Sequence, residues 1–204
     1  MNELEVKETL RLNLGFSSFD IQKLEYFVNL LIKYNIKYNL ISKNSESLVW
    51  HRHILDSAQL NKYVDTKENY IMADFGTGAG FPGVVLAIFN KNKNFHVKLY
   101  EKSPVKRDFL NKVINQIKLN VEIHDNVYNG LITADIIVCR AFKKLEHIIK
   151  ISREIVRKPH QIIILKGKNA QAEINNVSLA SNYSYKLENS ITDADSKIIL
   201  IKVR

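Results

Sequence analysis

The sequence has one cysteine, Cys139, few glycines and no long apolar run. One cysteine cannot form an internal disulfide, so we expect a protein of a reducing compartment, the cytoplasm. The longest apolar runs, Val84–Phe89 and Ile162–Leu165, are far shorter than the roughly 20 residues of a membrane-spanning helix. The first residues are mixed in charge and lead into no apolar segment, which argues against a secretory signal. We therefore expect no association with membranes.

The chain has 204 residues, of which 46% are apolar and 25% charged, enough for one ordinary domain with a small appendage. Its formal net charge is +9, from 30 basic and 21 acidic residues. Residues 1–60 hold seven of each, so the whole basic excess lies in residues 61–204. A basic excess attracts polyanions such as nucleic acids, although it also fits a protein that is merely rich in lysine.

The first sixty residues are predicted to be helical. Ser17 and Asp20 form a capping-box pattern, and apolar residues then recur at three- and four-residue spacing from Ile21 to Tyr34. A second helical stretch is expected at 45–60. Short amphipathic helices need a surface to pack on. We therefore assign residues 1–62 to an N-terminal helical region that packs on the rest of the chain.

From residue 63 onward, short apolar runs alternate with helical patterns, of which Ser103 followed by Pro104 is the clearest helix start. This alternation predicts an α/β fold with a mostly parallel, seven-stranded sheet at 63–204. The loop 188–196 is too short for a crossover helix, so the last two strands should form an antiparallel hairpin. The predicted strands are Tyr70–Phe75, His96–Tyr100, Val121–His124, Asp135–Val138, Gln161–Leu165, Tyr183–Leu187 and Lys197–Val203.

A glycine-rich loop follows the first predicted strand. Four of the seven glycines lie within residues 74–83, at Gly76, Gly78, Gly80 and Gly83. Glycines let the backbone approach a ligand closely, and the following helix start presents unpaired N–H groups. The sequence therefore predicts a ligand cradle between a strand and a helix.

Two cofactors fit this loop. From Gly78 it matches the G-x-G-x-x-G pattern of NAD-dependent oxidoreductases, with Glu101 as the ribose-binding acid. From Asp74 it is D-x-G-x-G-x-G, and a carboxylate there would attract the ammonium group of S-adenosyl-L-methionine while repelling a pyrophosphate. Glu101 can accept from ribose hydroxyls in either case. The terminal hairpin also favours a methyltransferase sheet, which is our preferred interpretation.

Several segments resemble one family in order and approximate spacing. They are Asn39–Ser42, His53–Ser57 (HILDS), Asp74–Gly83 (DFGTGAGFPG), Arg140–Phe142 (RAF) and Leu165–Gly167 (LKG). The chain resembles ribosomal RNA small-subunit methyltransferase G, also called glucose-inhibited division protein B. The resemblance implies a Rossmann-like class I methyltransferase that uses S-adenosyl-L-methionine to methylate N7 of a guanine in 16S ribosomal RNA. Its partner would be that RNA or a small-subunit ribosomal particle. A non-catalytic ribosome-assembly protein stays open as an alternative.

The resemblance also implies roles for single residues. Gly76 and Phe81 match loop residues that contact the cofactor. Arg140 matches a residue that closes the site at the end of the fourth strand, and we carry it over as a cofactor contact as well. After the third strand, the family usually has Arg-Ala-Glu. Here Asn126, Val127 and Tyr128 depart from that pattern, and we carry over Val127 and Tyr128 as cofactor contacts.

Guanine N7 carries a free lone pair, so the reaction requires no general base and its main demand is alignment of the reactants. We expect Arg140 to position the substrate through guanine O6 or a phosphate, and Lys166 to hold a phosphate. His53 and Asp56, one helical turn apart, should bond to each other and tie the helical region to the sheet. No metal is expected, and Cys139 should be a buried packing residue.

Overall fold

The predicted sheet forms with all seven strands, in the order β3-β2-β1-β4-β5-β7-β6. The computed structural model covers the chain and describes residues 1–66, 68–177 and 181–204. Strands β1 to β5 run parallel to one another. Strand β7 is antiparallel to both β5 and β6, which confirms the predicted hairpin. The strands are β1 (Ile71–Phe75), β2 (His96–Tyr100), β3 (Val121–His124), β4 (Ile136–Arg140), β5 (His160–Lys166), β6 (Tyr183–Asn189) and β7 (Lys197–Val203).

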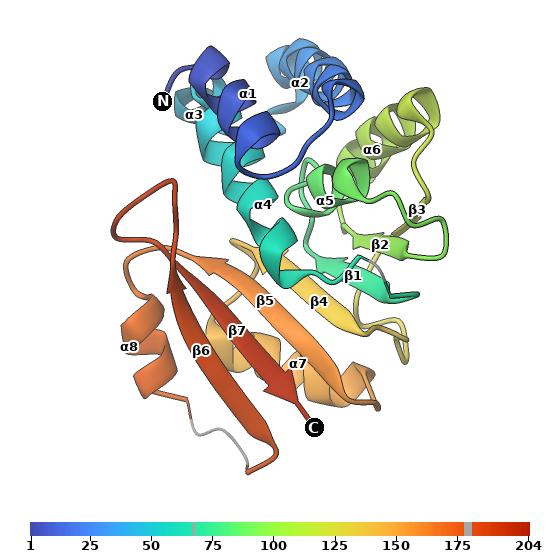
Figure 1. Cartoon of the computed structure of the whole chain (residues 1–204). Helices are drawn as coiled ribbons and strands as arrows, with labels where there is room; N and C mark the ends of the chain where they lie inside the picture. The colour runs from blue at the N-terminus through green and yellow to red at the C-terminus, as the bar shows by residue number, and fades with distance from the viewer. Residues whose placement is uncertain (67, 178–180) are drawn as a thin grey trace.

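Helices cover both faces of this sheet (Figure 1). Helices α1 to α6 lie on one side, and α7 and α8 pack on the other, where their apolar residues share a core with alternate residues of β1, β4, β5 and β7. The helices are α1 (Glu3–Leu12), α2 (Ser18–Tyr38), α3 (Lys43–Glu46), α4 (Asp56–Ala58), α5 (Gly83–Phe89), α6 (Pro104–Ile117), α7 (Leu145–Ile155) and α8 (Ala170–Asn175).

The helix starts follow from local side-chain chemistry. Helix α2 begins at the predicted capping box, where Ser17 Oγ accepts from Asp20 N and Asp20 Oδ2 accepts from Ser17 N. Helix α6 begins after Ser103, with Pro104 in the first turn. These bonds satisfy N–H groups that the first helical turn leaves without intrahelical partners.

The second predicted helical stretch, at 45–60, is irregular. It holds the end of α3, a π-helical turn η1 (Trp50–Leu55), α4, and the start of a 3₁₀ turn η2 (Gln59–Tyr63). A π-turn in the middle of such a segment is uncommon and often marks a functional position. This segment carries the residues of the N-terminal region that reach the sheet.

The N-terminal helices share one apolar core with the sheet. This core runs from Val6 and Leu24 in the first helices to Ile198 in the last strand. The boundary at 62/63 stays a prediction, and it falls next to the last residue of η2. Within the described ranges, no helix is long and apolar enough to cross a membrane.

Candidate functional site

A cavity of about 670 Å³ lies at the carboxyl ends of β1, β2, β3 and β4. Its size is within the range of roughly 300–1,000 Å³ that is common for small-molecule sites. It sits where the strand order reverses between β1 and β4, the usual ligand position in an open α/β sheet. Its walls include most of the predicted site residues, namely Gly76, Gly78, Phe81, Glu101, Val127, Tyr128 and Arg140.

The glycine loop forms one wall of this cavity. Gly76 and Gly78 adopt φ values of +70° and +60°, a region that side chains rarely occupy. A Cβ atom at Gly76 would lie 2.4 Å from the Phe142 ring, whereas at Gly78 it would meet no nearer atom than Gly76 O at 4.0 Å. Gly78 therefore leaves open space at its Cβ position in the cavity wall. This is a cradle that a side chain would fill, and it fits a bound cofactor.

Gly80 has different surroundings from Gly76 and Gly78. It is not among the lining residues of the cavity, and a Cβ there would lie 2.7 Å from Val84 and 3.1 Å from Leu110. Its lack of a side chain lets the loop pack against α5 and α6. Gly80 therefore lies behind the cavity wall, and its contact with a cofactor stays a prediction.

Asp74 lies at the end of β1, behind the glycine loop. Its carboxylate is fully buried, and its Oδ2 accepts from Gly83 N, at the start of α5, at 2.8 Å. Asp74 is not among the residues that line the cavity, and its contact with the ammonium group of a cofactor stays a prediction. Asp74 ties the end of β1 to the first residue of α5 and fixes the loop between them.

Burial raises the pKa of Asp74 to about 7, although the Gly83 N–H bond opposes that change. Because the pKa of Asp74 is higher in the folded state, protonation of its carboxyl group stabilises the folded protein. This stabilisation is fully present below the ordinary pKa of 3.8 and is lost as pH rises through the folded value of about 7. We expect Asp74→Asn, which stays neutral and can still accept from Gly83, to unfold at a higher temperature than the wild type at pH 8. The difference between the two unfolding temperatures should be smaller at pH 5. Thermal unfolding monitored by circular dichroism measures it. A difference that is independent of pH would contradict this assignment.

Glu101 lies at the end of β2 and faces the loop. It is 7% exposed; its Oε2 accepts from Gly78 N at 3.0 Å and its Oε1 from Ser103 N at 2.8 Å. A carboxylate offers about four acceptor positions, so further hydroxyl donors can bind. Glu101 both orients the cradle and presents acceptor capacity to the cavity, as expected of a ribose-binding acid.

Arg140 lies at the end of β4 and reaches to the N-terminal region. Its guanidinium lies 5.2 Å from the centre of the Phe81 ring, and His53 stacks on the same ring at 5.0 Å. Its Nη1 donates to Arg52 O at 2.8 Å and contacts Asp56 Oδ2 at 3.4 Å. Burial lowers the pKa of Arg140, whereas Asp56 works in the opposite direction. An arginine nonetheless keeps its charge in proteins.

His53 does not form the expected bond with Asp56. Its Nδ1 lies 2.6 Å from Arg140 Nη2. Arginine can only donate, so this nitrogen accepts and the ring proton is on Nε2. Burial, followed by the Arg140 charge, lowers the pKa of His53 to about 3, so the ring is neutral. His53 and Asp56 do link the helical region to the sheet, but they do so through Arg140 rather than through each other.

Lys166, at the end of β5, is not placed to hold a phosphate as expected. Its ammonium donates to Lys143 O at 2.8 Å and to both carboxylate oxygens of Glu173, at 3.0 and 2.8 Å. These bonds use the three donors of an ammonium group. Glu173 Oε2 also accepts from Leu145 N, at the start of α7. Lys166 therefore links β5, α7 and α8, and it does not line the cavity.

The segment after β3 reaches the cavity as expected, although its sequence departs from the family pattern. Val127 is 4% exposed and Tyr128 is 52% exposed, and both line the cavity together with Asp125 and Asn126. Asn126 Oδ1 accepts from Tyr128 N at 3.1 Å and so shapes this turn.

Sequence reasoning missed several lining residues. Phe142 packs against Gly76, and Leu40 and Ile41 bring the N-terminal region to the cavity wall. Leu40, Ile41 and Phe142 belong to segments that carry the family resemblance, which was the available signal for them. Cys139 is fully buried, and burial raises the pKa of its thiol, as expected of a packing residue. Among the described residues, no group of three or more His, Cys, Asp or Glu side chains could hold a metal ion.

Comparison with known sequences gives a match over most of the chain. Residues 20–199 match the family described as GidB, rRNA small subunit methyltransferase G. The chain is 37% identical over 200 residues to a "Ribosomal RNA small subunit methyltransferase G" of Orientia tsutsugamushi, covering 98% of each chain. A protein of the same name from Rickettsia akari is 38% identical over 180 residues, which cover 88% of this chain and 92% of the relative.

Solved structures with a similar fold are distant in sequence. A ribosomal protein L11 methylase from Lactobacillus delbrueckii subsp. bulgaricus aligns with a TM-score of 0.57 and 13% identity, over 72% of this chain and 77% of its own. The TYW2 protein of M. jannaschii, solved with AdoMet, aligns with a TM-score of 0.54 and 18% identity, over 74% of both chains. At such low identity these structures support the fold alone, and they confirm the predicted Rossmann-like methyltransferase architecture.

Proposed function

Because this chain belongs to the rRNA small subunit methyltransferase G family, we propose that it methylates N7 of a guanine in 16S ribosomal RNA. Membership of this family identifies the chain as an rRNA methyltransferase that depends on S-adenosyl-L-methionine. Of the two cofactors that fit the glycine loop, this selects S-adenosyl-L-methionine over NAD. The proposal adds the acceptor atom, the RNA and the roles of individual residues. The observation that carries it is the cavity between Gly78, Glu101 and Arg140 at the reversal of strand order.

The residues of the cavity divide into those that hold the cofactor and those that face the acceptor. We assign Gly76, Gly78, Phe81 and Glu101 to the cofactor, with Val127 and Tyr128 beside its adenine. When bound, S-adenosyl-L-methionine supplies an electrophilic methyl group. The chain's own contribution is to hold the reactants in line, which can lower a barrier substantially without acid–base chemistry.

Arg140 is placed at the boundary where donor and acceptor would meet. Arg140 and His53 line both the main cavity and a neighbouring cavity of about 450 Å³. A guanidinium is a fork of donors that suits guanine O6 or a phosphate, so we assign Arg140 to positioning of the nucleotide. His53 Nδ1 is engaged by Arg140 and is not available as a base. This arrangement accords with N7, which carries no proton to remove.

Basic side chains at the cavity support an RNA substrate. Lys102, Lys106 and Lys143 are among its lining residues. Lysines at this position can contact phosphates next to the target nucleotide, and such contacts make binding weaker as salt increases. They lie in the part of the chain that carries the whole basic excess.

The acceptor atom can be tested with a substituted RNA. The purified chain, S-adenosyl-L-methionine and 16S RNA from a strain that lacks this enzyme should yield one methylated guanosine. The same RNA synthesised with 7-deazaguanosine, which has carbon in place of N7, should yield no methylation. Transfer to the 7-deaza RNA at the wild-type rate would show that another atom is the acceptor. Absence of transfer to guanosine in both naked RNA and ribosomal particles would leave the assembly-protein alternative.

A further inference from the structure

Arg140 is held by one short stretch of the N-terminal region. Its acceptors are Arg52 O, His53 Nδ1 and Asp56 Oδ2, which come from the π-helical turn η1 and the first residue of α4. Asp56 is the carboxylate in this set, and the Arg140 and Asp56 side chains are 18% and 17% exposed. The direction of the guanidinium therefore depends on all three acceptors, of which Asp56 is the charged one and Arg52 O and His53 Nδ1 are the nearer ones.

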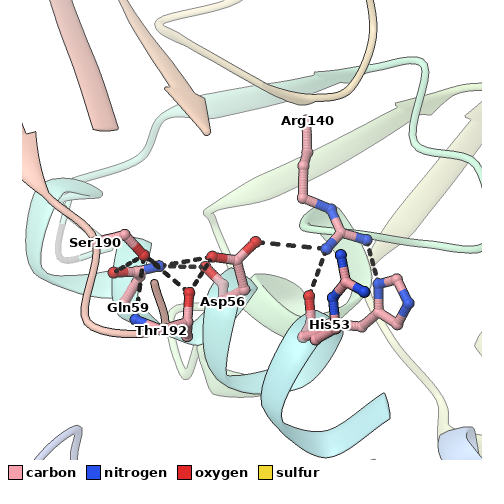
Figure 2. A network of polar contacts seen from close by, with 7 residues as sticks. His53, Asp56, Gln59, Arg140, Ser190 and Thr192 are labelled. Carbon is pink, nitrogen blue, oxygen red and sulfur yellow. Dashed lines mark hydrogen bonds and ion pairs between the residues drawn. The ribbon is translucent and has the colours of Figure 1, made fainter. Parts of the chain in front are cut away.

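The Asp56 carboxylate is itself held from the opposite side (Figure 2). Its Oδ1 accepts from Thr192 Oγ1 at 2.8 Å and from Gln59 Nε2 at 2.9 Å. The last torsion of an aspartate side chain is broad, so donors on one oxygen determine where the other oxygen points. With Oδ1 engaged by two donors, Oδ2 is directed to Arg140.

Gln59 connects this carboxylate to the loop between β6 and β7. It is fully buried, its Nε2 donates to Ser190 Oγ at 3.0 Å, and its Oε1 accepts from Ile191 N at 2.9 Å. Ser190 Oγ also lies 2.8 Å from Thr192 Oγ1. Gln59 and Ser190 are buried and Asp56 and Thr192 are half-buried, and a polar network of this kind is rigid when its members are satisfied. It joins residues that are more than 130 positions apart in the chain.

We propose that Thr192 and Gln59 are positioning residues, which hold Asp56 so that it fixes Arg140 for methyl transfer. Neither residue lines the main cavity, although Thr192 lines the neighbouring cavity of about 450 Å³ together with Asp56 and Arg140. The Thr192 hydroxyl donates to Asp56 Oδ1, so we assign its effect to Asp56 and Arg140 rather than to the reactants. The β6–β7 loop thereby supports the active site through Asp56 and Arg140, although it lies at the far edge of the sheet. This inference rests on the proposed function for its kinetic consequence, but the placement of Arg140 can be measured without any reaction.

Thr192→Val removes the hydroxyl and keeps the shape of the side chain. We expect kcat for methylation of 16S RNA to fall about 10- to 100-fold, because a small misplacement of a positioning group costs that much. The Kd for S-adenosylhomocysteine should stay within about twofold, since the cofactor wall is untouched. Thr192→Ser, which restores a hydroxyl, should recover most of kcat. Thr133→Val is a matched control, because Thr133 is exposed and precedes β4 at the opposite end of the strand.

Side-chain NMR of Arg140 provides the second measurement. In the wild type, a guanidinium held by three acceptors should give slowly exchanging side-chain N–H signals. Thr192→Val should lose this protection, whereas Thr192→Ser and Thr133→Val should keep it. A wild-type chain that does not methylate RNA would refute the proposed function, and the NMR comparison would still decide the inference about Thr192.

Two results would overturn the inference. The first is a Thr192→Val variant with wild-type kcat and unchanged Arg140 signals. The second is a fall in kcat that Thr192→Ser does not reverse and that follows a matching fall in thermal stability. That pattern would show a structural role for the loop and no specific effect on Arg140.

Discussion

Gly78→Val should reduce the affinity for S-adenosylhomocysteine by more than about 100-fold, equivalent to about 2.8 kcal/mol of binding free energy. The Gly78 backbone lines the cavity, its Cβ position is open, and Glu101 accepts from its N–H. A branched side chain there would occupy space that the cofactor needs. The φ of +60° also disfavours a β-branched residue, so the loop would shift away from Glu101.

Isothermal titration calorimetry measures this effect directly. Gly130→Val is the control, because Gly130 also has a positive φ, +121°, but has no atom within 4 Å of its Cβ position and does not line the cavity. It carries backbone strain without blocking the site, so its affinity should match the wild type. NAD should not bind to the wild type. Wild-type affinity in Gly78→Val would show that the cofactor lies elsewhere.

Arg140→Ala should lower turnover by about 100-fold, the loss expected when the acceptor nucleotide is no longer held in line with the methyl donor. Its Kd for S-adenosylhomocysteine should change by less than about threefold. The reason is that the hydrogen bonds of Arg140 go to the helical region, whereas Glu101 is held by Gly78 N and Ser103 N, so the cradle stays in place without Arg140. Single-turnover kinetics with 16S RNA and calorimetry give the two quantities separately.

The conservative variant Arg140→Lys separates charge from geometry. A lysine keeps the charge but cannot reproduce the planar fork, so it should recover only a small part of the lost turnover. Thermal unfolding of each variant shows how much of the effect comes from a loosened helical region. Equal losses of turnover and cofactor affinity in Arg140→Ala would contradict its assignment to the acceptor.

The sheet could be predicted from sequence because its signals are local. Each predicted strand ends within two residues of the observed one, and the short loop before β7 was sufficient to indicate the antiparallel hairpin. Helix α1 was not predicted as a separate element, although Asn2 and Glu5 form a capping box at its start. Local patterns of this kind depend on a few neighbouring residues, which a sequence displays directly.

The direction in which a polar side chain points was the harder part. Asp74 and Lys166 were correctly placed at strand ends, but Asp74 faces the N–H of Gly83 and Lys166 faces Glu173. Residues that are near in sequence supply both partners, yet a strand end can turn its side chain either to a ligand or to the next helix. The contacts of Arg140 with Arg52, His53 and Asp56 bring together distant segments, and no local pattern reveals such contacts.

Position-resolved mass mapping of 16S RNA tests the central claim most directly. RNA from cells that express this chain should carry one 7-methylguanosine that is absent from cells lacking it and restored by the wild-type gene but not by Arg140→Ala. An identical methylation pattern in the presence and absence of the chain would contradict the account.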